Sequence, residues 1–134
     1  MISPADLITY ARTQQTPLSK EVACRSGISR AYYGAYHYCV AAADRWCDQI
    51  PSEVMQSLSK SLGSHEKLYL RMEQYCTNHS VSESIRFMAQ SAKKLKFERV
   101  IADYHLDKNV DSKQVTTALH IATKIQAEYD KLVS

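Results

Sequence analysis

The segment ISRAYYGAYHYCVAAADRW, residues 28–46, decides the fold of this protein. Its small and apolar residues recur at intervals of three and four, which places them on one face of an α-helix. This face consists of Ile28, Ala31, Tyr32, Ala35, Cys39, Ala42, Ala43 and Trp46. Gly27 and Gly34 lie near one side of the same helix, where a glycine costs about 1 kcal/mol relative to alanine. We interpret them as points where a neighbouring helix packs closely.

Further helices are expected on both sides of this one. Ser3, Pro4 and Asp6 form a helix start, with a serine cap, a proline in the first turn and an acid beside the exposed amides. Ser19 is the expected cap of the long helix, and Pro51 ends it. The remaining segments are a connection over 51–64 that could hold a short helix, and helices over 64–76, 82–104 and from Asp111 or Ser112 onward. The pattern predicts an all-α protein, an antiparallel four-helix bundle with a short additional N-terminal helix, in one domain over residues 1–134.

The composition agrees with one helical domain. The 134 residues include 17 Lys and Arg against 14 Asp and Glu, a net charge of +3. This mild excess allows a transient contact with phosphate but lacks the charge density of a dedicated nucleic-acid coat. Three glycines and three prolines argue against a turn-rich all-β fold. Because no apolar run approaches about 20 residues and the start does not resemble a signal peptide, we expect a cytoplasmic protein without membrane contact.

The cysteines and histidines form no recognisable metal-binding pattern. The four cysteines include no CxxC pair, and we interpret them as small, mostly buried thiols: Cys24, Cys39, Cys47 and Cys76. Cys76 and His79 form a CxxH, and His65 and His105 have suitable atoms, but a structural zinc site needs two more ligands at a recognisable spacing. We expect no metal and no cofactor. Phosphate-binding glycine loops and nucleophile elbows are also absent from the sequence.

Residues 25–39, RSGISRAYYGAYHYC, carry more polar and aromatic side chains than helix packing requires. Arg30 and Tyr33, or Tyr33 and His37, can meet at helical spacing. The alternative is structural, with buried tyrosines whose hydroxyl groups find side-chain partners. The residues alone leave both interpretations open.

Residues 97–107, FERVIADYHLD, form the second candidate segment. Arg99 and Asp103 are four apart and share a helix face, whereas His105 is six residues beyond Arg99 and therefore about 120° away on a straight helix. His105 can approach Arg99 only at a frayed helix end or across a symmetric dimer. The structural alternative is an Arg–Asp pair with an exposed terminal histidine stabilised by the helix dipole.

Basic residues precede this segment. Lys93, Lys94 and Lys96 could carry RNA phosphates toward it, although cations near a helix end also complement the helix dipole. Tyr104, with Tyr33 or Tyr36, could stack on an RNA base. The candidate RNA-binding set is Lys93, Lys94, Lys96 and Tyr104.

Three motifs, in this order, resemble the HEPN superfamily, the small helical nucleotide-binding domains of higher eukaryotes and prokaryotes. They are RSGISRAYYGAYH at 25–37, GSH at 63–65 and RVIADYH at 99–105. The resemblance covers essentially the whole chain and is to small stand-alone prokaryotic members, many of them encoded beside a minimal nucleotidyltransferase. It implies a four- or five-helix bundle that forms a homodimer, with Arg30, Tyr33 and His37 in a supporting motif.

In active members, the resemblance implies a metal-independent endoribonuclease with an arginine and a histidine about four to six residues apart. Arg99 and His105 have five residues between them. His105 is then the general acid or base, Arg99 stabilises phosphoryl charge and Asp103 orients Arg99. Such proteins act as toxins or defence effectors with a neutralising partner of the nucleotidyltransferase type. Val100 stands where catalytic members usually carry a polar residue, so the second hypothesis is a non-catalytic module that binds a nucleotidyltransferase or a nucleotide.

Overall fold

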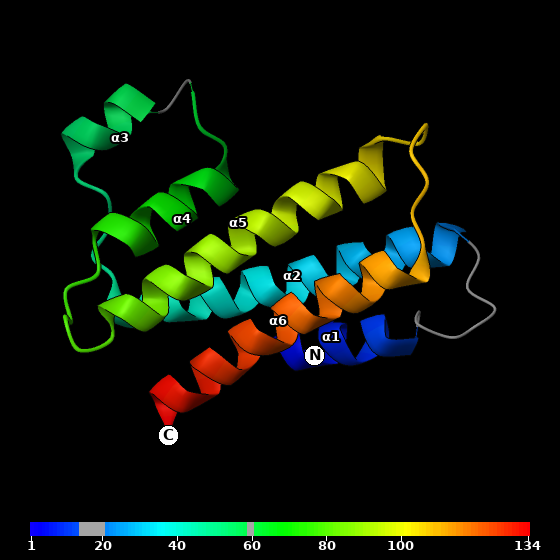
Figure 1. Cartoon of the computed structure of the whole chain (residues 1–134). Helices are drawn as coiled ribbons and strands as arrows, with labels where there is room; N and C mark the ends of the chain where they lie inside the picture. The colour runs from blue at the N-terminus through cyan, green and yellow to red at the C-terminus, as the bar shows by residue number, and fades with distance from the viewer. Residues whose placement is uncertain (14–20, 59–60) are drawn as a thin grey trace.

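The computed structural model describes residues 1–13, 21–58 and 61–134, and within these ranges the chain forms six helices (Figure 1). Their bounds are α1 Pro4–Thr13, α2 Glu21–Trp46, α3 Ser52–Leu58, α4 Ser64–Gln74, α5 Ser82–Tyr104 and α6 Ser112–Val133. The all-helical class is confirmed for these residues. The expected cap Ser19 lies outside the described residues. The 51–64 stretch, expected mainly as a connection, contains the seven-residue helix α3.

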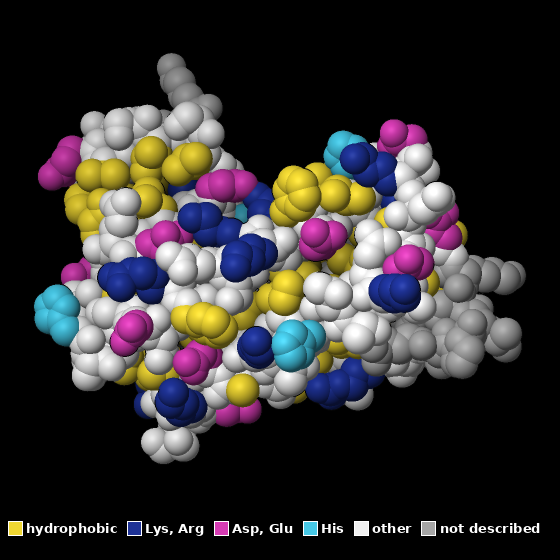
Figure 2. All heavy atoms as spheres, in the orientation of Figure 1, with side chains coloured by type: hydrophobic (Ala, Val, Ile, Leu, Met, Phe, Trp, Pro, Cys, Tyr) yellow, Lys and Arg dark blue, Asp and Glu magenta, His cyan; other side chains and the backbone are white. Residues whose placement is uncertain are grey.

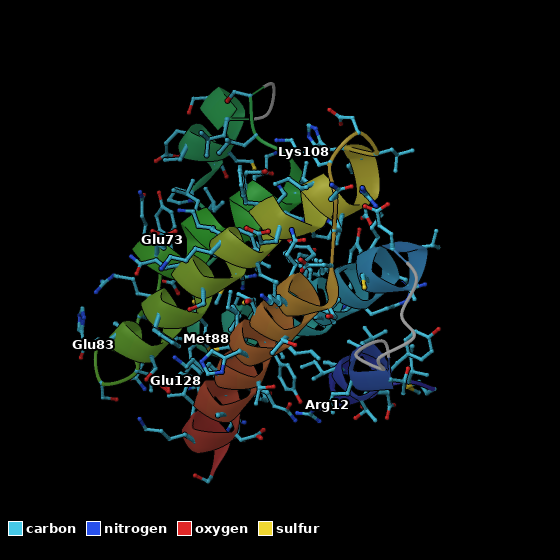
Figure 3. The ribbon with its side chains drawn as sticks, turned by 45° about the vertical axis from the view of Figure 1, so that its right-hand side comes forward. Arg12, Glu73, Glu83, Met88, Lys108 and Glu128 are labelled. Atoms are coloured by element: carbon cyan, nitrogen blue, oxygen red, sulfur yellow. The ribbon has the colours of Figure 1, made fainter. Side chains whose placement is uncertain are left out.

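The long helix α2 forms the centre of the molecule. It packs against α1, α4, α5 and α6, and α5 also packs against α4 and α6. In Figure 1, α5 runs opposite to α2, α4 and α6, and α3 projects beside α4 at one end. Figure 3 shows Met88 pointing from α5 into the bundle, where it is fully buried, while Glu83 lies at the outer edge. The helical bundle is therefore organised around the segment with the small residues.

Two helix starts have the caps that the sequence predicts. The Ser3 hydroxyl accepts a bond from the Asp6 N–H at 3.2 Å, and the Asp6 carboxylate accepts one from the Ser3 N–H at 2.7 Å. Asp111 and Gln114 form the same reciprocal arrangement at the start of α6. Asp111, not Ser112, is therefore the cap of the last helix.

Gly34 is the point of closest contact between α2 and α1. A Cβ atom at this position would lie 2.7 Å from Ile8 Cγ1 and 3.0 Å from the carbonyl oxygen of Pro4. No side chain larger than hydrogen fits at these distances unless α1 moves. The interpretation of Gly34 as a close-packing position is confirmed.

The cysteines divide into two pairs. Cys24 and Cys39 are buried in the core, as predicted, whereas Cys47 and Cys76 are only half-buried, at the ends of α2 and α4. The second pair is less enclosed because both residues lie where their helices have ended, although both side chains still pack against the core. None of the helices within the described ranges combines the length and the apolar character needed to cross a bilayer.

Candidate functional site

Arg99 is the most deeply buried charged side chain of the candidate site, with 7% of its surface exposed. Its guanidinium carbon lies 5.1 Å from the ring centroid of Tyr32, 5.5 Å from that of Tyr33 and 5.8 Å from that of Tyr104. These distances are within the range of cation–π attraction. Among the buried side-chain nitrogen and oxygen atoms of the described residues, Arg99 Nε alone has no hydrogen-bond partner.

Asp103 connects Arg99 to α2. Its Oδ2 accepts a hydrogen bond from Arg99 Nη1 at 3.4 Å and another from the Ser29 hydroxyl at 3.3 Å. The predicted Arg99–Asp103 pair therefore forms one turn apart on α5. Ser29 was not expected here, because its partner is far away in the sequence.

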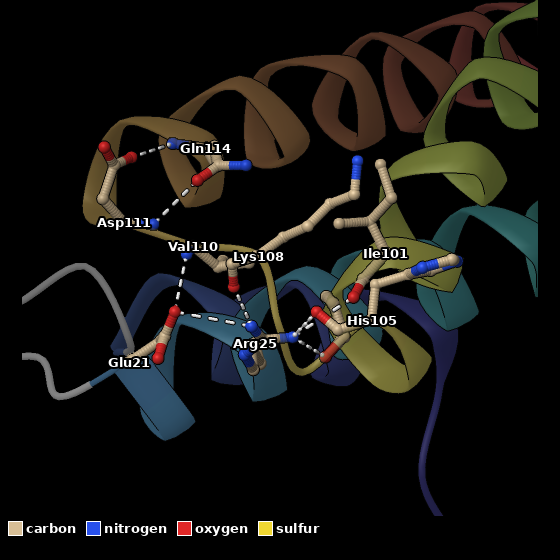
Figure 4. A network of polar contacts seen from close by, with 9 residues as sticks. Glu21, Arg25, Ile101, His105, Lys108, Val110, Asp111 and Gln114 are labelled. Atoms are coloured by element: carbon tan, nitrogen blue, oxygen red, sulfur yellow. Dashed lines mark hydrogen bonds and ion pairs between the residues drawn. The ribbon is translucent and has the colours of Figure 1, made fainter.

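His105 caps the C-terminal end of α5, and its side chain is exposed. Its backbone N–H donates to the carbonyl of Ile101 at 3.0 Å. The imidazole points away from Arg25 (Figure 4) and makes no hydrogen bond or ring contact with any described residue. In the described chain, no hydrogen bond, ion pair or ring contact joins the buried Arg99 guanidinium to the exposed His105 imidazole.

Arg25 holds the C-terminal end of α5 from the side of α2 (Figure 4). Its Nη1 donates to the carbonyl oxygens of Ile101 at 3.2 Å, Ala102 at 2.9 Å and His105 at 3.2 Å. Its Nη2 donates to the carbonyl oxygen of Lys108 and contacts the Glu21 carboxylate at 3.4 Å. Carbonyl groups at a helix end have no partner within the helix, so a buried guanidinium satisfies several at once.

Glu21 extends this arrangement to the start of α6. Its carboxylate accepts a hydrogen bond from the backbone N–H of Val110 at 2.8 Å. From the sequence alone, no function was assigned to Glu21 or Arg25. A glutamate and an arginine four residues apart at a helix start do, however, indicate an ion pair. The connection that carries His105 is therefore fixed by side chains from α2.

His65 lies at the start of α4, and the sequence identified it only as part of the GSH motif and as a possible metal ligand, without its partners. Its Nδ1 lies 2.6 Å from the hydroxyl oxygen of Tyr32, which is also 2.6 Å from the hydroxyl oxygen of Tyr69. The Tyr36 ring stacks on the imidazole with centroids 4.2 Å apart. Burial, together with the positive charges of Lys96 and Arg99, lowers the pKa of His65. The GSH motif thus places a neutral histidine in the same aromatic cluster as Arg99.

The three candidate RNA-binding lysines have different surroundings. Lys93 forms an ion pair with Glu73 at 2.7 Å, and Lys96 forms one with Glu66, so both face acids of α4. These two pairs line a groove of about 460 Å³ between α4 and α5. Lys94 is exposed, with no ion pair to a described residue.

The predicted supporting residues on α2 are spread around the helix. Tyr33 is half-buried against Arg99, and its ring meets His65 edge-on with centroids 6.3 Å apart. His37 is exposed and touches the Tyr36 ring at 5.3 Å, and Arg30 is exposed on the α1 side. The helix therefore directs Tyr33 into the site and the other two away from it.

An exposed apolar surface adjoins His105. Tyr104 is 70% exposed, Leu106 76% and Phe97 65%. Phe97 and Tyr104 are seven residues apart and therefore share one face of α5. In Figure 2, hydrophobic side chains flank a hollow between the end of α5 and the α3–α4 region.

No three His, Cys, Asp or Glu side chains of the described ranges come together as a metal ion would require. Comparison of the chain with protein-family models, with curated proteins and with solved structures found no match in any of the three.

Proposed function

We propose that this protein is a HEPN-type homodimer that cleaves RNA in the cytoplasm without a metal ion, as a toxin or defence effector. The order of the three motifs and the helical bundle support the proposal. The observation that carries it is the end of α5, where the exposed His105 and Tyr104 adjoin the buried Arg99 and its half-buried partner Asp103. We infer a HEPN topology for the bundle, in which α5 runs antiparallel to α2 and α6 (Figure 1).

His105 supplies the proton transfers in this proposal. Imidazole is the side chain best suited to general acid–base catalysis, and His105 is exposed to a substrate. It can take the proton of a ribose 2′-hydroxyl and return a proton to the leaving 5′-oxygen. Because Arg25 fixes the backbone of His105, the imidazole starts from a defined position.

Arg99 supplies positive charge beneath Tyr104. Its guanidinium is buried and its Nε is unpartnered, so its charge is screened less than that of a surface arginine. A developing negative charge on phosphate is stabilised by such a fixed cation. Because Arg99 and His105 do not touch within one protomer, the proposal requires a second copy whose motif faces the first.

The exposed apolar side chains give the second copy a place to dock. Tyr104 and Leu106 flank His105 in the sequence, and Phe97 lies about two turns earlier on the face of α5 that carries Tyr104. A symmetric interface there would bring the two motifs together. We further propose a neutralising partner of the nucleotidyltransferase type, which would cover the same surface.

The test is cleavage of a mixed RNA pool by the purified dimer with excess chelator present. We expect His105→Ala to lower the cleavage rate about 100-fold or more, and Arg99→Ala to lower it as well. The matched controls are His120→Ala and Arg86→Ala, which change exposed residues on α6 and α5. Each variant is first shown to be folded and dimeric. Unchanged cleavage by folded His105→Ala dimers would overturn the proposed mechanism.

A second function is favoured by the separation of Arg99 from His105. Arg99 is enclosed by tyrosines and paired with Asp103, which is what a structural arginine requires. In this alternative, the protein is a non-catalytic HEPN module that binds a nucleotidyltransferase or a nucleotide. Expression of the protein alone then leaves growth unchanged. The folded dimer binds the nucleotidyltransferase or the nucleotide and does not cut RNA.

A further inference from the structure

The C-terminal ends of α2 and α4 meet at one point of the fold. Cys47 follows α2, Cys76 lies just beyond α4, and the two residues oppose each other in an isolated antiparallel bridge. The backbone N–H of Asp48 donates to the carbonyl oxygen of Tyr75 at 2.6 Å, and the backbone N–H of Thr77 donates to the carbonyl oxygen of Trp46 at 3.2 Å.

These hydrogen bonds flank the two cysteines and do not join them. Cys47 and Cys76 therefore form a non-hydrogen-bonded antiparallel pair, the type in which the Cα atoms are about 4.5 Å apart and the side chains lie closest. A disulfide requires Cα atoms about 4.4–6.8 Å apart. The bridge meets this requirement without movement of the backbone.

Arg71 holds the two helix ends together. From α4, it donates to the carbonyl oxygens of Ala43 at 3.0 Å, Cys47 at 3.1 Å and Asp48 at 3.1 Å, and it forms an ion pair with Asp44 at 3.1 Å. The carbonyl acceptors lie at or just beyond the end of α2, and the Ala43 carbonyl also accepts the backbone N–H of Cys47. The positions of the cysteines are thus fixed by contacts other than their own.

Both thiols are free and half-buried, whereas Cys24 and Cys39 are enclosed in the core. Burial first, and then the neighbouring Cys76 thiol, raises the pKa of Cys47 to about 12. Cys47 is therefore almost entirely protonated at neutral pH. A raised pKa disfavours the Cys47 thiolate. In the order that we expect, Cys76 therefore attacks the oxidant first and Cys47 resolves the mixed disulfide.

We propose that Cys47 and Cys76 form a reversible intramolecular disulfide when the folded protein meets a low-molecular-weight disulfide such as oxidised glutathione. The Cys76 thiolate attacks one sulfur of the oxidant, forming a mixed disulfide and releasing one glutathione thiolate. The Cys47 sulfur then attacks Cys76 Sγ, which releases the second. The two cysteines lose two electrons and two protons, and the oxidant leaves as two glutathione thiols.

The disulfide closes the loop that carries α3 and α4, residues 48–75. Closing a loop of this length restricts the unfolded chain, so the oxidised protein unfolds at a temperature roughly 5–10 °C higher than the reduced one. The bridge lies at the end of the bundle opposite the C-terminal end of α5 (Figure 1). The proposal is independent of RNA cleavage.

The test is incubation of the folded full chain with oxidised glutathione, followed by denaturation in acid, alkylation and mass spectrometry. We expect the number of alkylated cysteines to fall from four to two, with one peptide pair linking Cys47 to Cys76, and dithiothreitol to restore all four. Cys47→Ser and Cys76→Ser lose the cross-link, whereas the control Cys24→Ser still forms it. Four alkylated cysteines in the oxidised wild type, a stable glutathione adduct at Cys76, or a cross-link that includes Cys24 or Cys39 would each overturn the proposal.

Discussion

Arg25 on α2 donates a hydrogen bond to the backbone carbonyl oxygen of His105 at 3.2 Å. The end of α5 is therefore positioned by a side chain from a helix that precedes it by most of the chain. Three further carbonyl groups share the same guanidinium. The location of His105 depends on Arg25 as much as on α5 itself.

Replacement of Arg25 should destabilise the protein markedly. Arg25→Ala removes a charged donor from four carbonyl groups, of which those of Ile101 and His105 keep a backbone donor, and from the Glu21 carboxylate, which keeps the Val110 N–H. Hydrogen bonds to a charged group contribute about 1.5–3 kcal/mol each at most. We expect the free energy of unfolding in urea to fall by about 2–4 kcal/mol. Arg30→Ala, at an exposed position on the same helix, should change it by less than about 0.5 kcal/mol. Equal effects of the two variants would contradict the anchoring role.

Gly34→Ala should destabilise the contact between α1 and α2. Alanine favours a helix by about 1 kcal/mol over glycine, but the new Cβ atom would lie 2.7 Å from Ile8 Cγ1. Overpacking costs about 1–3 kcal/mol, so we expect a net loss in thermal or urea unfolding. In an Ile8→Ala background, Gly34→Ala should destabilise the protein less, because Ile8 Cγ1, the nearer of the two crowding atoms, is absent. A strictly additive double mutant would argue against the close contact.

Tyr32 and Tyr69 should differ in their sensitivity to loss of the hydroxyl group. Tyr32→Phe removes the group that bonds both His65 and Tyr69, whereas Tyr69→Phe leaves the bond between Tyr32 and His65. We expect a loss of about 2 kcal/mol for Tyr32→Phe and about 1 kcal/mol for Tyr69→Phe in urea unfolding. The reverse order would show that the Tyr32 hydroxyl is not the centre of the cluster.

The lowered pKa of His65 predicts a pH dependence of stability. The unfolded chain binds a proton at this residue near pH 6.5, whereas the folded protein binds it only at lower pH. The free energy of unfolding should therefore fall as the pH drops below about 6.5 and level off below the folded pKa. His65→Gln should flatten this part of the curve, and His120→Gln, at an exposed position, should not. Urea midpoints between pH 7.5 and 5 measure the difference.

Lys94 should contribute more to RNA affinity than Lys93. Lys93 already has the Glu73 carboxylate as a partner, whereas Lys94 is exposed to solvent. If Lys94 contacts phosphate, Lys94→Ala should weaken binding and reduce the salt slope by about 0.7. Lys93→Ala is the matched control, one residue away. The measurement is RNA binding by fluorescence anisotropy at several salt concentrations, and equal slopes for the wild type and Lys94→Ala would exclude a phosphate contact there.

The sequence alone was sufficient for features that depend on neighbouring residues. It predicts the apolar spacing of α2, the cap at Ser3 and the Arg99–Asp103 pair, and it narrows the last cap to Asp111 or Ser112, because the partners lie within about one helical turn. The short helix α3 was not clearly predicted, because its serine-rich sequence has no strong apolar period.

The tertiary structure decided which distant side chains meet. The contacts of Arg25 with the end of α5, of Tyr32 with His65, and of Cys47 with Cys76 join residues from different helices. No local period contains this information, because the direction and packing angle of each helix are set by the whole core. Helix formation was therefore determined locally by the sequence, whereas the candidate site was assembled only when α2, α4 and α5 packed together.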